Sequence, residues 1–119
     1  ERYPARGVNV RRLDHFNCLA VDVRACREFL ERTLGFRCTE RIELDSGLEV
    51  GMWLTATNKS YDVAYAREGK GVPGRLHHVT FALDSREAIL QAADTFLEAG
   101  VAIENGPHKH AIQQTFFLY

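Results

Sequence analysis

Two histidines occupy equivalent positions in two similar stretches of this sequence. His15 lies in the strand-like segment 13–20, and His78 lies in the strand-like segment 76–83, 63 positions later (78 − 15). Successive side chains of a strand point to opposite faces, so each histidine falls on the face away from the helix expected after its segment. Imidazole is the commonest metal ligand in proteins, and two imidazoles with one carboxylate hold iron in non-haem Fe(II) oxygenases. The pattern predicts that His15 and His78 bind a metal together.

A single histidine in a strand is more often structural than functional, because its ring nitrogens find hydrogen-bond partners within the fold. The repeat changes this balance, since the two histidines share one register. His77 is adjacent to His78, but strand alternation places it on the helix-facing side. We therefore select His78, and not His77, as the partner of His15.

The elements expected in the first stretch are a strand, a helix and three further strands. The helix is predicted at 23–34, where Asp22 provides an N-cap and Gly35 ends the apolar stripe. Two strand-like runs separated by a turn at 45–47 predict a hairpin. The three strands after the helix are expected at 36–44, 48–55 and 62–65.

The second stretch repeats this order after a glycine-rich connection. A strand at 76–83 is followed by an amphipathic helix, which Asp84 or Ser85 caps and Gly100 closes. The chain is thus predicted to be an α+β tandem repeat. The second copy is expected to be incomplete, because the apolar, strand-like segment 115–119 ends the sequence.

The expected domain organisation follows from this repeat. Residues 1–11 have no periodic pattern and are interpreted as a linker from an upstream domain. Residues 12–119 are interpreted as one catalytic domain with a first module at 12–68 and a truncated second module at 75–119. We expect the sequence to be a fragment of a longer protein.

Composition narrows the range of functions. The 119 residues are 45% hydrophobic and carry a formal net charge of −1, so no basic surface for nucleic acid is indicated. No apolar run approaches the roughly 20 residues that span a bilayer, so no membrane contact is expected. Three cysteines outside any CxxC motif favour a reducing, cytoplasmic setting.

Six segments together match the pattern of a known family. They are Leu13-Asp14-His15-Phe16-Asn17, Thr33-Leu34-Gly35-Phe36, Asn58-Lys59, Gly74-Arg75-Leu76-His77-His78-Val79, Gly106-Pro107 with His110, and Tyr119. On these segments the sequence resembles the vicinal-oxygen-chelate superfamily, and within it the catalytic C-terminal domain of class I extradiol ring-cleaving dioxygenases of the catechol 2,3-dioxygenase type. The resemblance covers residues 12–119 and implies a glyoxalase-like fold of two tandem βαβββ modules around a metal ion.

The resemblance also implies the ligands of that metal. The two metal-binding histidines of the family match His15 and His78, in agreement with the register. The metal would be Fe(II), with Mn(II) as an alternative. The third ligand of the family is a glutamate that follows the family tyrosine, and it is expected beyond the C-terminus of this chain.

Further residues match the substrate-binding positions of the family. His110 matches a histidine that hydrogen-bonds the bound substrate and oxygen, and Tyr119 matches a tyrosine that contacts a catechol oxygen. Asn17 and Trp53 match positions that line the pocket for oxygen and substrate. Without the resemblance, Trp53 would be interpreted as a core residue and Tyr119 as a strand aromatic.

Two positions depart from the family pattern. Tyr61 stands where the family usually has an acid–base histidine, and a phenol with a pKa of about 10 is a poor base at neutral pH, although it can donate a hydrogen bond. Asn105 stands near the position of an arginine that binds a substrate carboxylate in homoprotocatechuate enzymes. The second departure favours an uncharged or differently substituted catechol.

The expected function is O2-dependent extradiol cleavage of a catechol-type ring in aromatic-compound degradation. His110 would act as proton donor, with Tyr119 and Tyr61 as further catalytic residues. The alternatives are a glyoxalase-like enzyme, which lacks the Gly-Pro-x-x-His motif with its tyrosine, and a metal-free ligand-binding module of the same superfamily. The expected partners are a catechol, O2 and a second copy of the chain.

Overall fold

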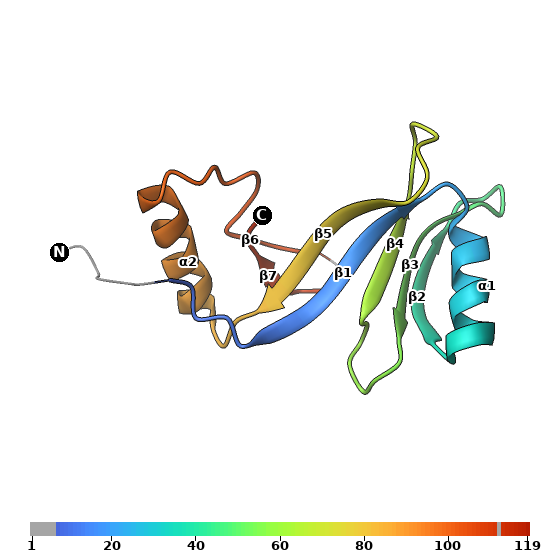
Figure 1. Cartoon of the computed structure of the whole chain (residues 1–119), viewed down its shortest axis with the longest axis horizontal. Helices are drawn as coiled ribbons and strands as arrows, with labels where there is room; N and C mark the ends of the chain where they lie inside the picture. Colours follow the sequence, from blue (N-terminus) through green and yellow to red (C-terminus); the bar gives the residue numbers. More distant parts are fainter. Residues whose placement is uncertain (1–6, 112) are drawn as a thin grey trace. The chain divides into compact units, whose positions relative to one another are not determined.

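The computed structural model describes residues 7–111 and 113–119 (Figure 1). The chain divides into two compact units, one of residues 13–80 and one that contains residues 81–119 with the segment before residue 13. The elements are β1 (Arg12–Ala20), α1 (Val23–Leu34), β2 (Arg37–Glu43), β3 (Glu49–Thr55), β4 (Val63–Arg67), β5 (Arg75–Ala82), α2 (Arg86–Glu98), β6 (His108–Lys109) and β7 (Phe116–Phe117). The predicted α+β class is confirmed, and the order from β1 to β4 is a βαβββ unit.

Local sequence signals define both ends of α1. The Asp22 side chain accepts a hydrogen bond of 2.9 Å from the amide of Ala25, which satisfies one donor that the first helical turn leaves open. Gly35 ends the helix with a left-handed φ of 67°, and its amide donates to the Leu30 carbonyl. The helix predicted at 23–34 is therefore confirmed at both boundaries.

One five-stranded sheet runs in the order β2-β3-β4-β1-β5. The hairpin predicted around residues 45–47 pairs β2 with β3 in antiparallel fashion, and β3 pairs with β4 in the same way. β1 is parallel to β4, with Phe16 opposite Val63 and Ala20 opposite Arg67. This order places β1, the strand of His15, next to β5, the strand of His78.

The two faces of this sheet have different characters. The core of this unit consists of buried apolar residues on the face that α1 covers, and Figure 1 shows the helix beside β2, β3 and β4. Its members are Ala20, Val23, Met52, Leu54 and Val63. Because side chains alternate along each strand, His15 and Asn17 of β1 lie on the opposite face from Phe16 and Cys18. The chemistry-bearing residues of β1 therefore point away from α1.

The unit of residues 81–119 consists of α2 and a C-terminal hairpin. Ser85, rather than Asp84, caps α2 through a 3.1 Å bond from the Ala88 amide, and Gly100 follows the last helical turn with a φ of 72°. The strand predicted at 115–119 is short, since only Phe116–Phe117 pairs with β6. Beyond this pair, the Tyr119 amide donates to the Asn105 carbonyl at 2.7 Å.

Two expectations about organisation stay predictions. The predicted linker falls partly on residues 1–6, which lie outside the described residues, and the division into modules at 12–68 and 75–119 is likewise untested. Arg11 binds the Ala82 carbonyl through its amide at 3.0 Å and the Asp84 carboxylate through its side chain at 2.5 Å.

Within the part of the chain that the structure describes, no helix is long and apolar enough to cross a membrane.

A buried carboxylate connects α1 to the sheet. The Glu49 side chain is 1% exposed and receives two hydrogen bonds from the Arg27 guanidinium, at 2.8 and 2.9 Å, and an ion pair from Arg24 at 3.0 Å. The hydrogen bond from Arg27 holds the pKa of Glu49 below its ordinary value, against the opposing effect of burial. A buried carboxylate of this kind requires its cationic partners, because an unpaired charge in the interior is costly.

We predict that Arg27→Met lowers the free energy of unfolding by about 3 kcal/mol at pH 7, because it leaves the buried Glu49 carboxylate without its bidentate partner. Since the folded-state pKa of Glu49 is lowered, this contribution is present above its unfolded pKa of about 4.3 and is lost as pH falls through the folded pKa. The difference between the two proteins should therefore shrink below about pH 4.

Urea unfolding at a series of pH values measures this difference. Arg32→Met is the matched control, because the Arg32 side chain is 78% exposed and pairs with Glu28 at 3.5 Å on the same helix. It should cost less than about 0.5 kcal/mol. Equal stability of the Arg27 and Arg32 variants at pH 7 would contradict the prediction.

Candidate functional site

His15 and His78 face each other within the unit of residues 13–80. Their ring centroids are 5.5 Å apart, and the rings are nearly perpendicular at 78°. The Tyr61 ring contacts His15 from the loop before β4, with centroids 4.7 Å apart and an angle of 65°. The convergence expected from the repeat is therefore present, and Tyr61 belongs to the same cluster.

The Nδ1 atoms of both histidines are engaged by their sequence neighbours. His15 Nδ1 lies 2.9 Å from Oδ2 of Asp14, and a carboxylate at this position fixes the ring orientation and directs Nε2 toward a ligand. His78 Nδ1 lies 2.8 Å from Nδ1 of His77, so one ring donates and the other accepts. Strand alternation predicts that His77 points away from His78, but the two adjacent rings approach to 4.9 Å between centroids.

Asn17 and Trp53 lie on the same sheet face as His15. Ala64 of β4 is opposite Asn17 on one side and opposite Trp53 on the other, and residues directly opposite in a sheet share a face. The intervening alanine leaves little side-chain volume between the amide and the indole. Asn17 Oδ1 is buried and has no hydrogen-bond partner in the described part of the chain, so it remains available as an acceptor on this face.

The donor set fits a divalent transition metal in part. Two imidazoles at this separation match the nitrogen ligands of a site with two histidines and one carboxylate. Among residues 7–111 and 113–119, no group of three histidine, cysteine, aspartate or glutamate side chains is arranged to hold a metal. The ligand roles of His15 and His78 stay predictions.

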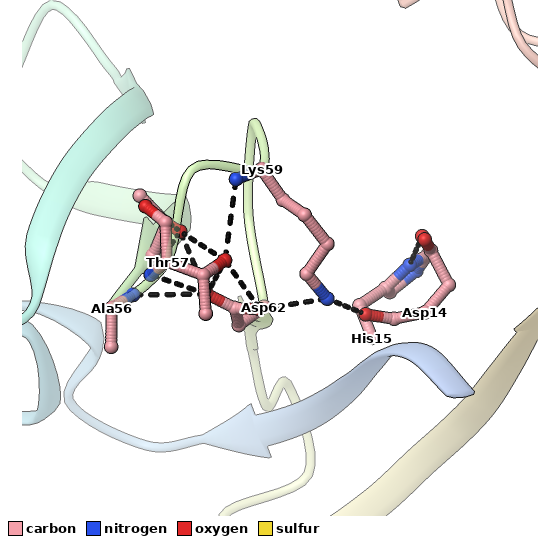
Figure 2. Close-up of polar contacts among 7 residues, drawn as sticks. Asp14, His15, Ala56, Thr57, Lys59 and Asp62 are labelled. Carbon is pink, nitrogen blue, oxygen red and sulfur yellow. Dashed lines mark hydrogen bonds and ion pairs between the residues drawn. The ribbon is translucent and has the colours of Figure 1, made fainter. Parts of the chain in front are cut away.

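The loop between β3 and β4 is built around the Asp62 carboxylate (Figure 2). This carboxylate accepts hydrogen bonds from Thr55 Oγ1 at 2.7 Å, from the Ala56 amide at 2.9 Å and from Thr57 Oγ1 at 3.0 Å, and it pairs with Lys59 Nζ at 2.7 Å. Burial alone raises the pKa of Asp62, but the hydrogen bonds from Lys59 and the other donors outweigh it and hold the pKa well below its ordinary range.

His110 and Tyr119 come together in the unit of residues 81–119. The His110 ring stacks on Phe117, with centroids 4.1 Å apart and an angle of 23°, and Phe117 lies 5.2 Å from the Tyr119 ring. Gly106 permits this hairpin, because a Cβ there would lie 2.6 Å from the Phe117 carbonyl oxygen. Burial raises the pKa of the Tyr119 phenol.

The predicted site residues thus form two groups. His15, Asn17, Trp53, Tyr61 and His78 belong to the unit of residues 13–80, and His110 and Tyr119 belong to the other unit. Sequence reasoning missed the contacts of Asp14 and Asp62, and it used Lys59 only as a family marker. The spacing Thr55, Thr57 and Asp62 carries a weak signal for a capped loop, but no local pattern indicates that Lys59 reaches Asp14.

Comparison with known proteins places these groups in a family. Residues 12–119 match the model of the Glyoxalase/Bleomycin resistance protein/Dioxygenase superfamily. The chain is 38% identical over 117 residues to a manganese-dependent 2,3-dihydroxybiphenyl 1,2-dioxygenase of Geobacillus genomosp. 3, covering 98% of this chain and 37% of the relative. It is 35% identical to a metapyrocatechase of Geobacillus stearothermophilus, covering 98% of this chain and 35% of the relative.

Solved structures give the same result. An extradiol ring-cleaving dioxygenase from B. fuscum superposes with a TM-score of 0.83 at 36% identity, over 94% of this chain and 31% of that chain. A 2,3-dioxygenase from Pseudomonas sp. KL28 superposes with a TM-score of 0.88 at 28% identity, over 95% of this chain and 39% of that chain. The chain spans little more than a third of the length of its curated relatives. The resemblance inferred from the sequence is confirmed, and the chain belongs to the Glyoxalase/Bleomycin resistance protein/Dioxygenase superfamily.

Proposed function

We propose that this chain carries two metal ligands of an extradiol dioxygenase, which cleaves a catechol-type ring beside its two hydroxyl groups with O2. The observation that carries the proposal is the pair of facing imidazoles of His15 and His78 on the sheet face away from α1. The names of the relatives support this reaction type, and one of them is a manganese-dependent enzyme acting on 2,3-dihydroxybiphenyl. Fe(II) or Mn(II) is therefore the proposed metal.

His15 and His78 would hold this metal, and a carboxylate would complete the set. When bound, the metal supplies a positive charge that lowers the pKa of the catechol hydroxyls and brings both reactants together. Asp14 holds the His15 ring through Nδ1 at 2.9 Å, which leaves the opposite nitrogen for the metal. Tyr61 packs on the His15 ring and is proposed to donate a hydrogen bond to a bound oxygen.

Asn17 and Trp53 are proposed to line the pocket for substrate and O2. The buried Asn17 Oδ1 offers an acceptor for a hydroxyl group, and the half-buried indole offers an apolar wall for a planar ring. Asn105, at the position of a carboxylate-binding arginine in related enzymes, favours a catechol without a carboxylate. Both atoms of O2 enter the ring-opened product, so the reaction needs no external reductant.

His110 and Tyr119 are proposed to act on the substrate directly. The imidazole of His110 would hydrogen-bond the bound reactants and donate a proton to the substrate as the ring opens, and the phenol of Tyr119 would hydrogen-bond a catechol oxygen. Stacking of His110 on Phe117 limits the orientations of its ring. Both roles stay predictions.

A cytoplasmic location and a homo-oligomeric state complete the proposal. Cys18, Cys26 and Cys38 are free thiols, in keeping with a reducing compartment. β5 ends the order of the five-stranded sheet, and an edge strand of this kind is a frequent site of pairing between copies. Size-exclusion chromatography at several concentrations that finds only monomer would count against oligomerisation.

We predict that this chain binds one Fe(II) in an anaerobic calorimetric titration, and that His15→Ala and His78→Ala each abolish saturable binding. His108→Ala is the matched control, because it removes an exposed imidazole that is tilted against Phe117, with 5.8 Å between ring centroids, in the other unit. Acetate should tighten the binding, since it supplies a carboxylate oxygen for the incomplete ligand set. Wild-type and His78→Ala chains with the same affinity would contradict the metal assignment.

Catechol binding should change the fluorescence of Trp53, which is the one tryptophan of the sequence. We expect a saturable change with catechol or 2,3-dihydroxybiphenyl in the presence of Fe(II), and no change in the His15→Ala chain. Trp53→Phe provides the signal blank. The same change without any metal would favour the metal-free ligand-binding module instead.

Phe117→Leu should remove the ring-current shift of His110. Protons of a ring stacked at 4.1 Å on another aromatic ring resonate upfield, so we expect the His110 ring protons to move toward their free-peptide positions in this variant. Phe116→Leu is the control, because Phe116 instead lies beneath the Arg86 guanidinium. Unchanged His110 signals in Phe117→Leu, measured by proton NMR, would contradict the stacked arrangement.

A further inference from the structure

Lys59 connects two parts of the chain that are distant in sequence. Its Nζ atom lies 2.7 Å from Oδ1 of Asp62 and also donates a hydrogen bond to the main-chain carbonyl of Asp14 (Figure 2). Asp14 directly precedes His15 in β1. The lysine therefore binds the strand at the peptide group next to a proposed metal ligand.

The far end of this connection is fixed. The Asp62 carboxylate accepts bonds from Thr55, Ala56 and Thr57, so it has little freedom to follow Lys59. The Lys59 amide donates to Thr57 Oγ1 at 3.2 Å, which holds the backbone of the lysine against the same loop. With the Lys59 side chain 27% exposed, this ion pair is better shielded from water than a surface pair.

The same loop also holds the other side of His15. The Phe16 amide donates to the Asp62 carbonyl at 3.4 Å, and the Tyr61 ring contacts the His15 ring. The peptide groups on both sides of His15 are thus bound to one loop, through Lys59 on one side and Asp62 on the other. The bond of Phe16 with Asp62 belongs to the parallel pairing of β1 with β4, which begins at Phe16 opposite Val63, whereas the bond of Lys59 to the Asp14 carbonyl is separate from that pairing.

We propose that Lys59 is a positioning residue for His15. Its bonds to the Asp14 carbonyl and the Asp62 carboxylate hold the part of β1 before Phe16, and with it the hydrogen bond between Asp14 and His15. The His15 ring is thereby kept in the orientation that presents Nε2 to a divalent metal. The metal in this inference rests on the proposed function, whereas the orientation of the ring does not. Groups that orient a ligand in this way affect metal affinity by about 10–100-fold.

The test compares Lys59→Met, Lys59→Arg and Lys70→Met. Methionine keeps the length of the lysine side chain without its charge or donors, arginine restores both, and Lys70 is an exposed lysine in the loop after β4. Co(II) is the metal probe, since it is not oxidised during the titration and its visible spectrum reports the ligands. We expect Lys59→Met to weaken Co(II) binding about tenfold, with affinity retained in Lys59→Arg and Lys70→Met.

A variant that is destabilised elsewhere separates positioning from a general loss of stability. Arg27→Met removes contacts of α1 with Glu49 and touches neither Lys59 nor His15, so it should keep the wild-type Co(II) affinity while the chain is folded. Urea unfolding verifies that each variant is folded at the temperature of the titration. An equal loss of Co(II) affinity in Lys59→Met and Arg27→Met would overturn the proposal.

A measurement without metal tests the same point. Two-bond proton–nitrogen NMR spectra of the metal-free chain distinguish the two tautomers of each histidine ring. We expect His15 in the wild-type chain to be protonated at Nδ1, facing Asp14, and to become a mixture of tautomers in Lys59→Met. Unchanged His15 signals would overturn the proposal. If the wild-type chain binds no Co(II), the proposed function fails, and these spectra alone decide the role of Lys59.

Discussion

The position of β1 between β4 and β5 is the constraint on which the candidate site depends. Parallel pairing with β4 fixes which residues of β1 face α1, because a shift of one residue would exchange the two faces. With Phe16 and Cys18 toward the helix, His15 and Asn17 must point the other way. The neighbouring β5 then brings His78 to a distance of 5.5 Å between ring centroids.

Much of this arrangement could be predicted from the sequence because its signals are local. Asp22 and Gly35 define α1 at both ends, and the turn at 45–47 defines the β2–β3 hairpin. The repeat adds one long-range expectation, since equivalent positions in two similar units occupy equivalent places on a sheet. The facing of His15 and His78 follows from that expectation and from strand alternation alone.

What the sequence could not predict depends on contacts between distant residues. The cap of α2 was ambiguous between Asp84 and Ser85, since either side chain is suited to the position. The approach of His77 to His78 breaks simple alternation, because an exposed ring can turn along the strand toward its neighbour. The contact of Lys59 with Asp14 joins residues 45 positions apart, and lysine in a loop is ordinarily solvated.

The loop around Asp62 shows how contacts between distant residues can fix a side chain in place. Burial of a carboxylate is unfavourable unless donors surround it, and here two hydroxyl groups, two backbone amides and an ammonium group supply them. Once the carboxylate is fixed, its ion pair with Lys59 keeps the lysine side chain ordered between Asp62 and Asp14. The part of β1 that precedes its register with β4 thereby gains a contact with this loop. In this protein the loop beside the sheet, and not the sheet alone, determines where the His15 imidazole points.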